Sequence, residues 1–205
     1  YSESFNTADA AGLFTIIDNN NDGKTWDYDS AGQRMRYTYG VKSAGDDWLI
    51  TPGIRLEKGK SYAFAFKVSK EMNSYTETME VYYGTSSDIA SMTKIADITD
   101  LTAEQQHLSY LVPALADGAH YFAFKATSPA NQYRIYVDDI NVVEECYANV
   151  PATINDLKVV AGAQGANEAT VTFTAPSTTL EGSALESLTR IEIYRNNSDV
   201  PITTI

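Results

Sequence analysis

Alternation of apolar and polar residues constrains the fold of this chain more than any other feature of its sequence. In the segment YAFAFKV, the apolar residues Tyr62, Phe64, Phe66 and Val68 occupy every second position, with small or charged residues between them. Successive side chains of a β-strand point to opposite faces of a sheet, so such a segment forms a strand with one buried face. The pattern recurs in RMRYTY, MEVYYG and HYFAFKAT, and turn-forming segments such as EKGK, GTSSD and LADGAH lie between these strands. The sequence therefore predicts an all-β fold, an antiparallel β-sandwich.

One strand departs from this pattern. In YRIYVDDINVV, Ile135 and Val137 have one parity and Ile140 has the other, so the apolar face changes across the two aspartates between them. A β-bulge would produce this change, and bulges often re-aim side chains at functional sites. The alternative is a strand that is buried on both of its faces.

The character of the sequence changes after Cys146. The segment YANVPATINDLKVVAG contains a proline and opens a second series of alternating strands, which continues in EATVTFTAP and TRIEIYRNN. We therefore predict a first domain over residues 1–146 and a second domain over residues 151–205. Because Cys146 is the single cysteine, the chain has no internal disulfide, and core packing, with or without a metal ion, must stabilise the fold.

Charge and hydropathy exclude two classes of partner. The chain has 27 acidic and 15 basic side chains, which give a net charge of -12. This charge repels phosphate backbones, so we expect no nucleic acid partner, whereas it suits the binding of divalent cations. No segment approaches the roughly 18 consecutive apolar residues of a membrane span, so we expect no membrane insertion. The chain begins at Tyr1 without a charged and then apolar leader, so we expect that any signal peptide was removed or lies outside this sequence.

The segment IDNNNDGKTW has the composition of a cation-binding loop. If Asp18 is counted as position 1, Asn20 is position 3, Asp22 is position 5, Gly23 is position 6 and Asp29 is position 12. Calcium-binding EF-hand loops take oxygen ligands from positions 1, 3, 5 and 12 and have glycine at position 6. The flanking segments read as strands, so the helices of an EF-hand are not expected. Because asparagine, aspartate and glycine are also the commonest turn residues, the alternative is a turn without an ion.

Several motifs together resemble a known family. ESFN, IDNNNDGKTW, DDWLITPGIRL, GKSYAFAFKV and YVDDINV occur in the order found in cleaved-adhesin domains, the haemagglutinin/adhesin modules of gingipain-type proteins. The resemblance covers about residues 2–143. It implies a jelly-roll β-sandwich with bound calcium and a role in adhesion rather than catalysis. It also implies a secreted or cell-surface location in a bacterium, since relatives of this family occur widely in Bacteroidetes.

The same resemblance implies a second calcium site at the chain ends. Glu3 near the start and Asp138 in the last strand match the carboxylates that hold it, and Asp46 in DDWL is a further candidate. An ion in this place would close the longest loop of the domain, where chain entropy opposes closure most. The alternative is that these acids are ordinary surface charges at strand ends.

The C-terminal segment resembles the first half of a fibronectin type III domain. Phe173 stands where that family usually has a tryptophan, and both residues fill the same core. Residues 151–205 supply about four strands, whereas a sandwich of this kind uses about seven. We therefore expect an incomplete second domain, whose apolar face is covered by the first domain, by another copy of the chain or by residues outside this sequence.

Aromatic residues fall into two groups. Trp26 and Trp48 lie inside motifs that accompany the fold, so we predict that both are buried. Tyr75, Tyr82 and Tyr110 are less tied to the alternating pattern, so they are the candidates for contact with a ligand.

Motifs for catalysis do not occur in the sequence. The two histidines, His107 and His120, belong to no nucleophile elbow or zinc-binding motif, and no phosphate-binding glycine loop occurs. The many acids leave open only a glycosidase-like carboxylate pair, whose separation a sequence does not reveal. We expect a non-enzymatic, calcium-stabilised cell-surface adhesin module that binds a host or matrix protein or a glycan. The alternatives are a carbohydrate-binding module and a structural spacer, each within a larger secreted multi-domain enzyme; the sequence identifies neither the ligand nor the oligomeric state.

Overall fold

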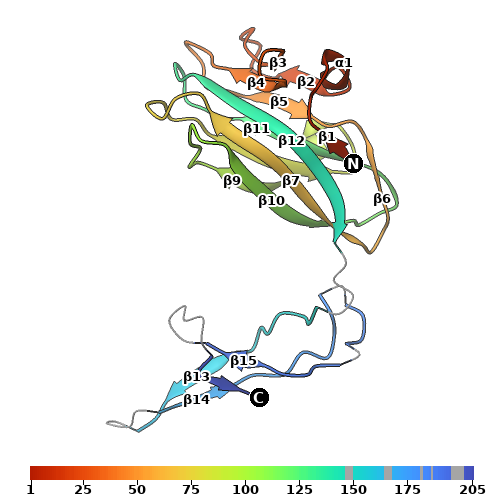
Figure 1. Ribbon diagram of the computed structural model, residues 1–205, viewed down its shortest axis with the longest axis vertical. Helices are drawn as coiled ribbons and strands as arrows, with labels where there is room; N and C mark the ends of the chain where they lie inside the picture. The colour runs from red at the N-terminus through yellow and green to blue at the C-terminus, as the bar shows by residue number, and fades with distance from the viewer. Residues whose placement is uncertain (146–149, 164–167, 181, 186, 195–200) are drawn as a thin grey trace. The chain divides into compact units, whose positions relative to one another are not determined.

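A computed structural model describes residues 1–145, 150–163, 168–180, 182–185, 187–194 and 201–205. The chain splits into two compact units, Tyr1–Glu145 and Cys146–Ile205 (Figure 1). Cys146 itself lies outside the described residues, so its environment is not characterised. Among the described residues, no helix is both long enough and apolar enough to cross a membrane.

Two antiparallel sheets form the first unit, and we name each after its long central strand. In the β7 sheet, β1 (Ser2–Glu3) pairs with β12, and the other strands follow the order β10 (Gln106–Pro113), β7 (Ser61–Lys70), β12 (Arg134–Glu145), β4 (Arg34–Thr38) and β3 (Trp26–Asp29). In the β11 sheet, β6 (Ile54–Leu56) pairs with β11, and the order is β2 (Thr15–Asp18), β5 (Asp47–Ile50), β11 (Gly118–Ala126), β8 (Met79–Gly84) and β9 (Thr93–Ile98). A short helix α1 (Ala8–Ala11) precedes β2, and a 3₁₀ turn η1 (Ile89–Ser91) connects β8 to β9.

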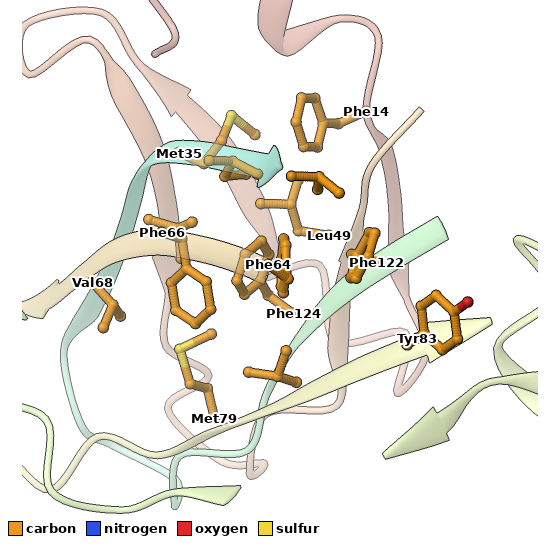
Figure 2. Packing of buried hydrophobic residues seen from close by; sticks show 14 of the residues in the cluster. Phe14, Met35, Leu49, Phe64, Phe66, Val68, Met79, Tyr83, Phe122 and Phe124 are labelled. Carbon is orange, nitrogen blue, oxygen red and sulfur yellow. The ribbon is translucent and has the colours of Figure 1, made fainter. Parts of the chain in front are cut away.

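Aromatic side chains fill the space between the two sheets. Phe64 of β7 stacks on Phe122 of β11 with ring centroids 4.2 Å apart, and Phe66 meets Phe124 edge-on at 4.8 Å. Figure 2 shows these rings gathered between the strands that carry them. The alternating residues of YAFAFKV are therefore the buried face of β7, as the sequence predicts.

A second apolar cluster lies on the outer face of the β11 sheet. Leu49 points into the central core, so its neighbours Trp48 and Ile50 point the opposite way, where they pack with Ala123. Partly buried side chains cover this cluster, among them Tyr82, Tyr121, Ile89 of η1 and Met92 directly after it. The predicted burial of both tryptophans is confirmed, since Trp26 is 2% exposed and Trp48 is 5% exposed. Only Trp26, however, belongs to the central core.

The irregular strand contains the β-bulge that its sequence indicates. The register between β12 and β7 shifts between Asp138 and Asn141, and Asp139 has a left-handed backbone with a φ of 47°. The bulge turns the Asp139 carboxylate toward Lys67, and their charged groups are 2.6 Å apart. Asp138 and Asp139 are half-buried, so this strand is not buried on both faces at that point.

The described residues of the second unit form two small antiparallel sheets. One pairs β13 (Lys158–Ala161) with β14 (Ala169–Thr172), and the other pairs β15 (Glu192–Ile193) with β16 (Thr203–Thr204). An open apolar hollow lies on this unit, with Leu157, Val159, Val171, Phe173, Ile193 and Ile202 among its lining residues. The described part of this unit is all-β, as predicted, and its assignment as a partial fibronectin type III domain stays a prediction.

We expect truncation of the central aromatic stack to destabilise the first unit strongly. Phe64→Ala should lower the free energy of unfolding by about 3–5 kcal/mol, because it removes a large, fully buried ring. Leu111→Ala on the neighbouring strand β10 is the control, since Leu111 is 48% exposed, and its effect should stay within about 0.5 kcal/mol. Urea denaturation followed by tryptophan fluorescence reports this unit alone, because both tryptophans lie in it. Equal losses for the two variants would contradict the assigned core.

Candidate functional site

The acidic loop between β2 and β3 folds around the carboxylate of Asp18. The amide of Asp22 donates to Asp18 Oδ1 at 3.2 Å, and the amide of Gly23 donates to Asp18 Oδ2 at 2.8 Å. Asn21 and Gly23 have left-handed backbones, with φ values of 55° and 76°, which turn the chain tightly enough for these contacts. The backbone amides of the loop thus hold both carboxylate oxygens of Asp18 in place.

Side-chain hydrogen bonds join this loop to the connection between β4 and β5. Asn20 Nδ2 donates to the carbonyl of Ala44 at 2.8 Å, and the hydroxyl of Ser43 donates to the carboxylate of Asp22. Asn19 donates through its backbone amide to the Asp46 carbonyl at 3.1 Å and through its side chain to Asp46 Oδ2 at 2.6 Å. The candidate metal-ligating residues of the loop therefore have a second segment of chain, residues 43–47, packed beside them.

Asp46, which the resemblance suggests as a calcium ligand, has protein partners. Lys125 Nζ lies 3.0 Å from Asp46 Oδ1, and Asn19 binds the other carboxylate oxygen. Burial opposes the ionisation of Asp46, but the Asn19 amide and the Lys125 ammonium outweigh it and hold its pKa below the ordinary value. The negative charge of Asp46 is therefore balanced by Lys125.

The next residue, Asp47, is the acid that sequence reasoning missed. Its side chain is completely buried, and its Oδ2 accepts a hydrogen bond from the Asp46 amide at 3.2 Å. No hydrogen-bond partner reaches its Oδ1. Burial raises the pKa of the Asp47 carboxyl to about 6, and the negative charges of Asp18 and Asp22 add to this rise. The signal was in the alternation: Asp47 has the same parity as the core residue Leu49.

The loop supplies the kind of ligand that calcium prefers, which is oxygen. Asp18, Asn20 and Asp22 offer carboxylate and amide oxygens, and the buried Oδ1 of Asp47 lacks a partner. In the described part of the chain, however, no three His, Cys, Asp or Glu side chains gather closely enough to hold a metal ion. The donor chemistry fits calcium, and a complete ligand set would also draw on the amide of Asn20 and on backbone carbonyl groups.

The predicted chain-end acids lie on paired strands. β1 pairs with β12, and Glu3 stands opposite Ile140. Each carboxylate accepts a hydrogen bond from its own segment, Glu3 from the Phe5 amide at 2.6 Å and Asp138 from the Asp139 amide at 2.7 Å. Burial, together with the charge of Asp139, raises the pKa of the Asp138 carboxyl. The structure joins the two strands that carry these acids, and a calcium ion between them stays a prediction.

The three candidate tyrosines do not form one surface. Tyr75 stacks on Tyr133, with ring centroids 5.4 Å apart. Tyr82 lies on the outer face of the β11 sheet against Trp48 at 4.6 Å, and its hydroxyl donates to Glu80. Tyr110 packs on the central core instead. The register between β10 and β7 explains this last position, since Tyr110 pairs with the buried Phe64. A shared role of these tyrosines in ligand contact stays a prediction that their arrangement does not favour.

The fold of the first unit matches those of solved adhesin and carbohydrate-binding domains. The K1 cleaved adhesin domain of Lys-gingipain from Porphyromonas gingivalis W83 is 19% identical with a TM-score of 0.58, and the match covers 71% of this chain and 98% of that domain. The K3 cleaved adhesin domain of the same protein is 17% identical with a TM-score of 0.57, and the match covers 69% of this chain and 95% of that domain. The module CBM1 of BiXyn10A is 14% identical with a TM-score of 0.55, and the match covers 71% of this chain and 97% of that module.

Comparisons by sequence add nothing to these matches, because no family model and no curated protein matches the chain. At such low identities the structural likeness concerns the fold. It confirms the jelly-roll β-sandwich and the resemblance to cleaved-adhesin domains at the level of architecture.

We expect the neighbouring acids Asp46 and Asp47 to titrate on opposite sides of the ordinary aspartate pKa of about 3.9. The pKa of Asp46 lies below that value because, despite its burial, Asn19 and Lys125 stabilise its charge. The pKa of Asp47 lies above it because burial opposes ionisation. The measurement is a pH titration of the carboxyl ¹³C shifts in EDTA. Lys125→Ala should raise the pKa of Asp46, because it removes the nearest positive charge, and should change that of Asp47 little. A single shared midpoint for both acids would contradict the described geometry.

Proposed function

We propose that this chain is a calcium-stabilised, non-catalytic adhesin module that acts outside a bacterial cell and binds a host or matrix protein or a glycan. The observation that carries the proposal is the extent of the structural likeness. The first unit overlays 98%, 95% and 97% of the length of three cleaved adhesin domains, so the comparison concerns whole domains and not a shared fragment. The acidic composition and the sequence motifs within the loops point the same way.

The positions of the histidines support a role without catalysis. His120 is buried, with Tyr83 Oη 2.7 Å from its Nδ1 and the Ala116 carbonyl 2.9 Å from its Nε2. Both ring nitrogens are therefore engaged in contacts within the fold. His107 lies on the outer face of β10, opposite Lys67 of β7, without an acid–base partner of its own among the described hydrogen bonds.

The charge of the loop supports calcium as a structural ion. Asp18 and Asp22 lie in one tight turn, and the Asp18 carboxylate accepts from the Asp22 amide. Asp47 lies nearby as a third negative charge that acts on the same region. A divalent cation would convert the repulsion among these acids into attraction, and it would bind the folded state in preference to the unfolded chain.

Carbohydrate binding is the second candidate function. It is favoured by the likeness to CBM1 of BiXyn10A and by the aromatic pair Trp48 and Tyr82 on the outer face of the β11 sheet. The Lys125 ammonium lies 5.4 Å from the centroid of the Trp48 ring, and only 5% of Trp48 is exposed. A sugar would need an open aromatic face, which Trp48 does not offer in this arrangement. We therefore place adhesion first.

We expect EDTA to lower the melting temperature of the first unit. Loss of an ion present at about a hundredfold excess over its Kd removes about 2.7 kcal/mol, which corresponds to roughly 5–10 °C for a domain of this size. Asp22→Ala should abolish most of this response if the acidic loop holds the dominant ion. Asp138→Ala is the comparison variant, because a response lost only in that variant would move the ion to the chain-end site. No response in the unmutated protein would remove calcium from the proposal.

We expect calcium-dependent binding to a macromolecular ligand. The measurement applies the intact chain to a panel of immobilised matrix proteins and to a glycan array, each with calcium and with EDTA. Binding to matrix proteins that weakens in EDTA would support the adhesin. Binding to glycans alone would favour a carbohydrate-binding module, and binding to neither would favour a structural spacer.

A further inference from the structure

A buried carboxylate without a counter-charge stands beside the acidic loop. Asp47 is completely buried, and a single hydrogen bond, from the Asp46 amide to Oδ2, is the only one its carboxylate receives in the described structure. No lysine or arginine of the described residues forms an ion pair with it. A buried ion in this state costs several kcal/mol, so natural folds normally supply a partner.

The neighbours of Asp47 add further negative charge and do not neutralise its own. Asp18 stands directly opposite Asp47 in the register between β2 and β5, and Asp22 follows four residues later in the loop. The hydroxyl oxygen of Thr25 is also enclosed and lacks a hydrogen-bond partner of normal geometry, although it lies close enough to lower the pKa of the Asp47 carboxyl. The region therefore contains three acidic side chains and two oxygens without a hydrogen bond of normal geometry. Among the described ion pairs, none involves Asp18, Asp22 or Asp47.

Lys125 lies nearby but does not balance the charge of Asp47, because its ammonium pairs with Asp46. The two acids point to different places. Asp46, directly before β5, lies beside Lys125, whereas Asp47 has the parity of the core residue Leu49. A buried water could donate a hydrogen bond to Asp47 Oδ1, but it would leave the negative charges unbalanced. A divalent cation satisfies both requirements, since it takes oxygen ligands and supplies positive charge.

We propose that Asp47 is a buried ligand of the cation bound by the Asp18–Asp22 loop, with the Thr25 hydroxyl as a neutral oxygen beside it. The inference rests on the proposed calcium-stabilised function and adds a ligand from a different strand. The acids do not converge on one point in the present arrangement. The bound ion therefore draws the loop toward Asp47, which it can do because it removes the repulsion between them. The ion then fastens the loop between β2 and β3 to the interior end of β5.

The first test compares two neighbouring carboxylates in the intact chain. Asp47→Asn keeps the shape of the side chain and removes its charge, and Asp46→Asn is the matched control, since Asp46 is already paired with Lys125. Calorimetric titration of EDTA-stripped protein with CaCl₂ should show at least about a tenfold loss of affinity for Asp47→Asn and less than about a threefold loss for Asp46→Asn.

Thermal unfolding of the same variants separates a ligand from a merely structural acid. In EDTA, Asp47→Asn should raise the melting temperature, because it removes an uncompensated buried charge. In calcium it should lower the melting temperature, because it removes a ligand of the ion. An acid that only accepts a hydrogen bond from buried water would change both temperatures in the same direction.

A measurement on the unmutated protein covers the case in which Asp47→Asn does not fold. Addition of CaCl₂ should shift the carboxyl ¹³C resonance of Asp47 together with those of Asp18 and Asp22, and should leave that of Asp46 nearly unchanged. Calcium binding with an unmoved Asp47 resonance, or with equal affinities in the two variants, would overturn this inference and leave the calcium-stabilised adhesin standing. Absence of any calcium binding would overturn both.

Discussion

Aromatic packing between the two sheets is the interaction on which the rest of the first unit depends. Phe64 and Phe66 of β7 meet Phe122 and Phe124 of β11, and their contact fixes the two sheets face to face. Within the first unit, the strand ends and the loops that follow them take their positions from this contact. The acidic loop is an example, since β2 and β5 hold Asp18 opposite Asp47 whether or not the two charges favour that arrangement. Burial of several large rings, each contributing about 1.5–3 kcal/mol, allows the fold to tolerate unfavourable charge at one end.

The sequence was informative wherever a local pattern decides the outcome. The period of two in YAFAFKV predicted the buried face of β7, and the change of parity around Asp138 predicted the bulge in β12. The pairing of strands far apart in sequence was not visible in the same way. The pairing of β5 with β11 places Lys125 beside Asp46, and the role of Asp46 as a metal ligand stays a prediction. The register with β7 places Tyr110 partly buried against the core, and its contact with a ligand stays a prediction. Both outcomes depend on cross-strand neighbours, which a single sequence does not specify.

The position of Asp47 was only partly predictable, because its direction follows from a local pattern and its burial follows from neighbours far away in the sequence. Its parity with Leu49 was readable in DDWLI, but a charged residue at an inward position looks like the end of a strand and not like part of a core. The structure shows why this position is unusual. The Trp26 ring nitrogen donates to the Asp47 carbonyl at 3.0 Å, so a large buried side chain of β3 contacts the backbone of the residue whose acid is buried. The alternation therefore assigns the direction of the side chain, whereas its complete burial depends on the surrounding packing, which the sequence does not specify.

The structural likeness to both adhesin and carbohydrate-binding domains has a physical explanation, because the interior of the sandwich and its surface are under different constraints. The sandwich interior accepts many combinations of apolar residues of suitable volume, so identities of 14–19% are compatible with one architecture. A ligand meets only the outer faces and the loops, where the chain has its own chemistry. Here the outer face of the β11 sheet is closed by Tyr82, Lys125 and Ile89 around Trp48 and Ile50, and it acts as a second small core. This aromatic surface is therefore part of the packing of the first unit, and the polar loops at the strand ends are where the proposed recognition and the proposed ion would meet.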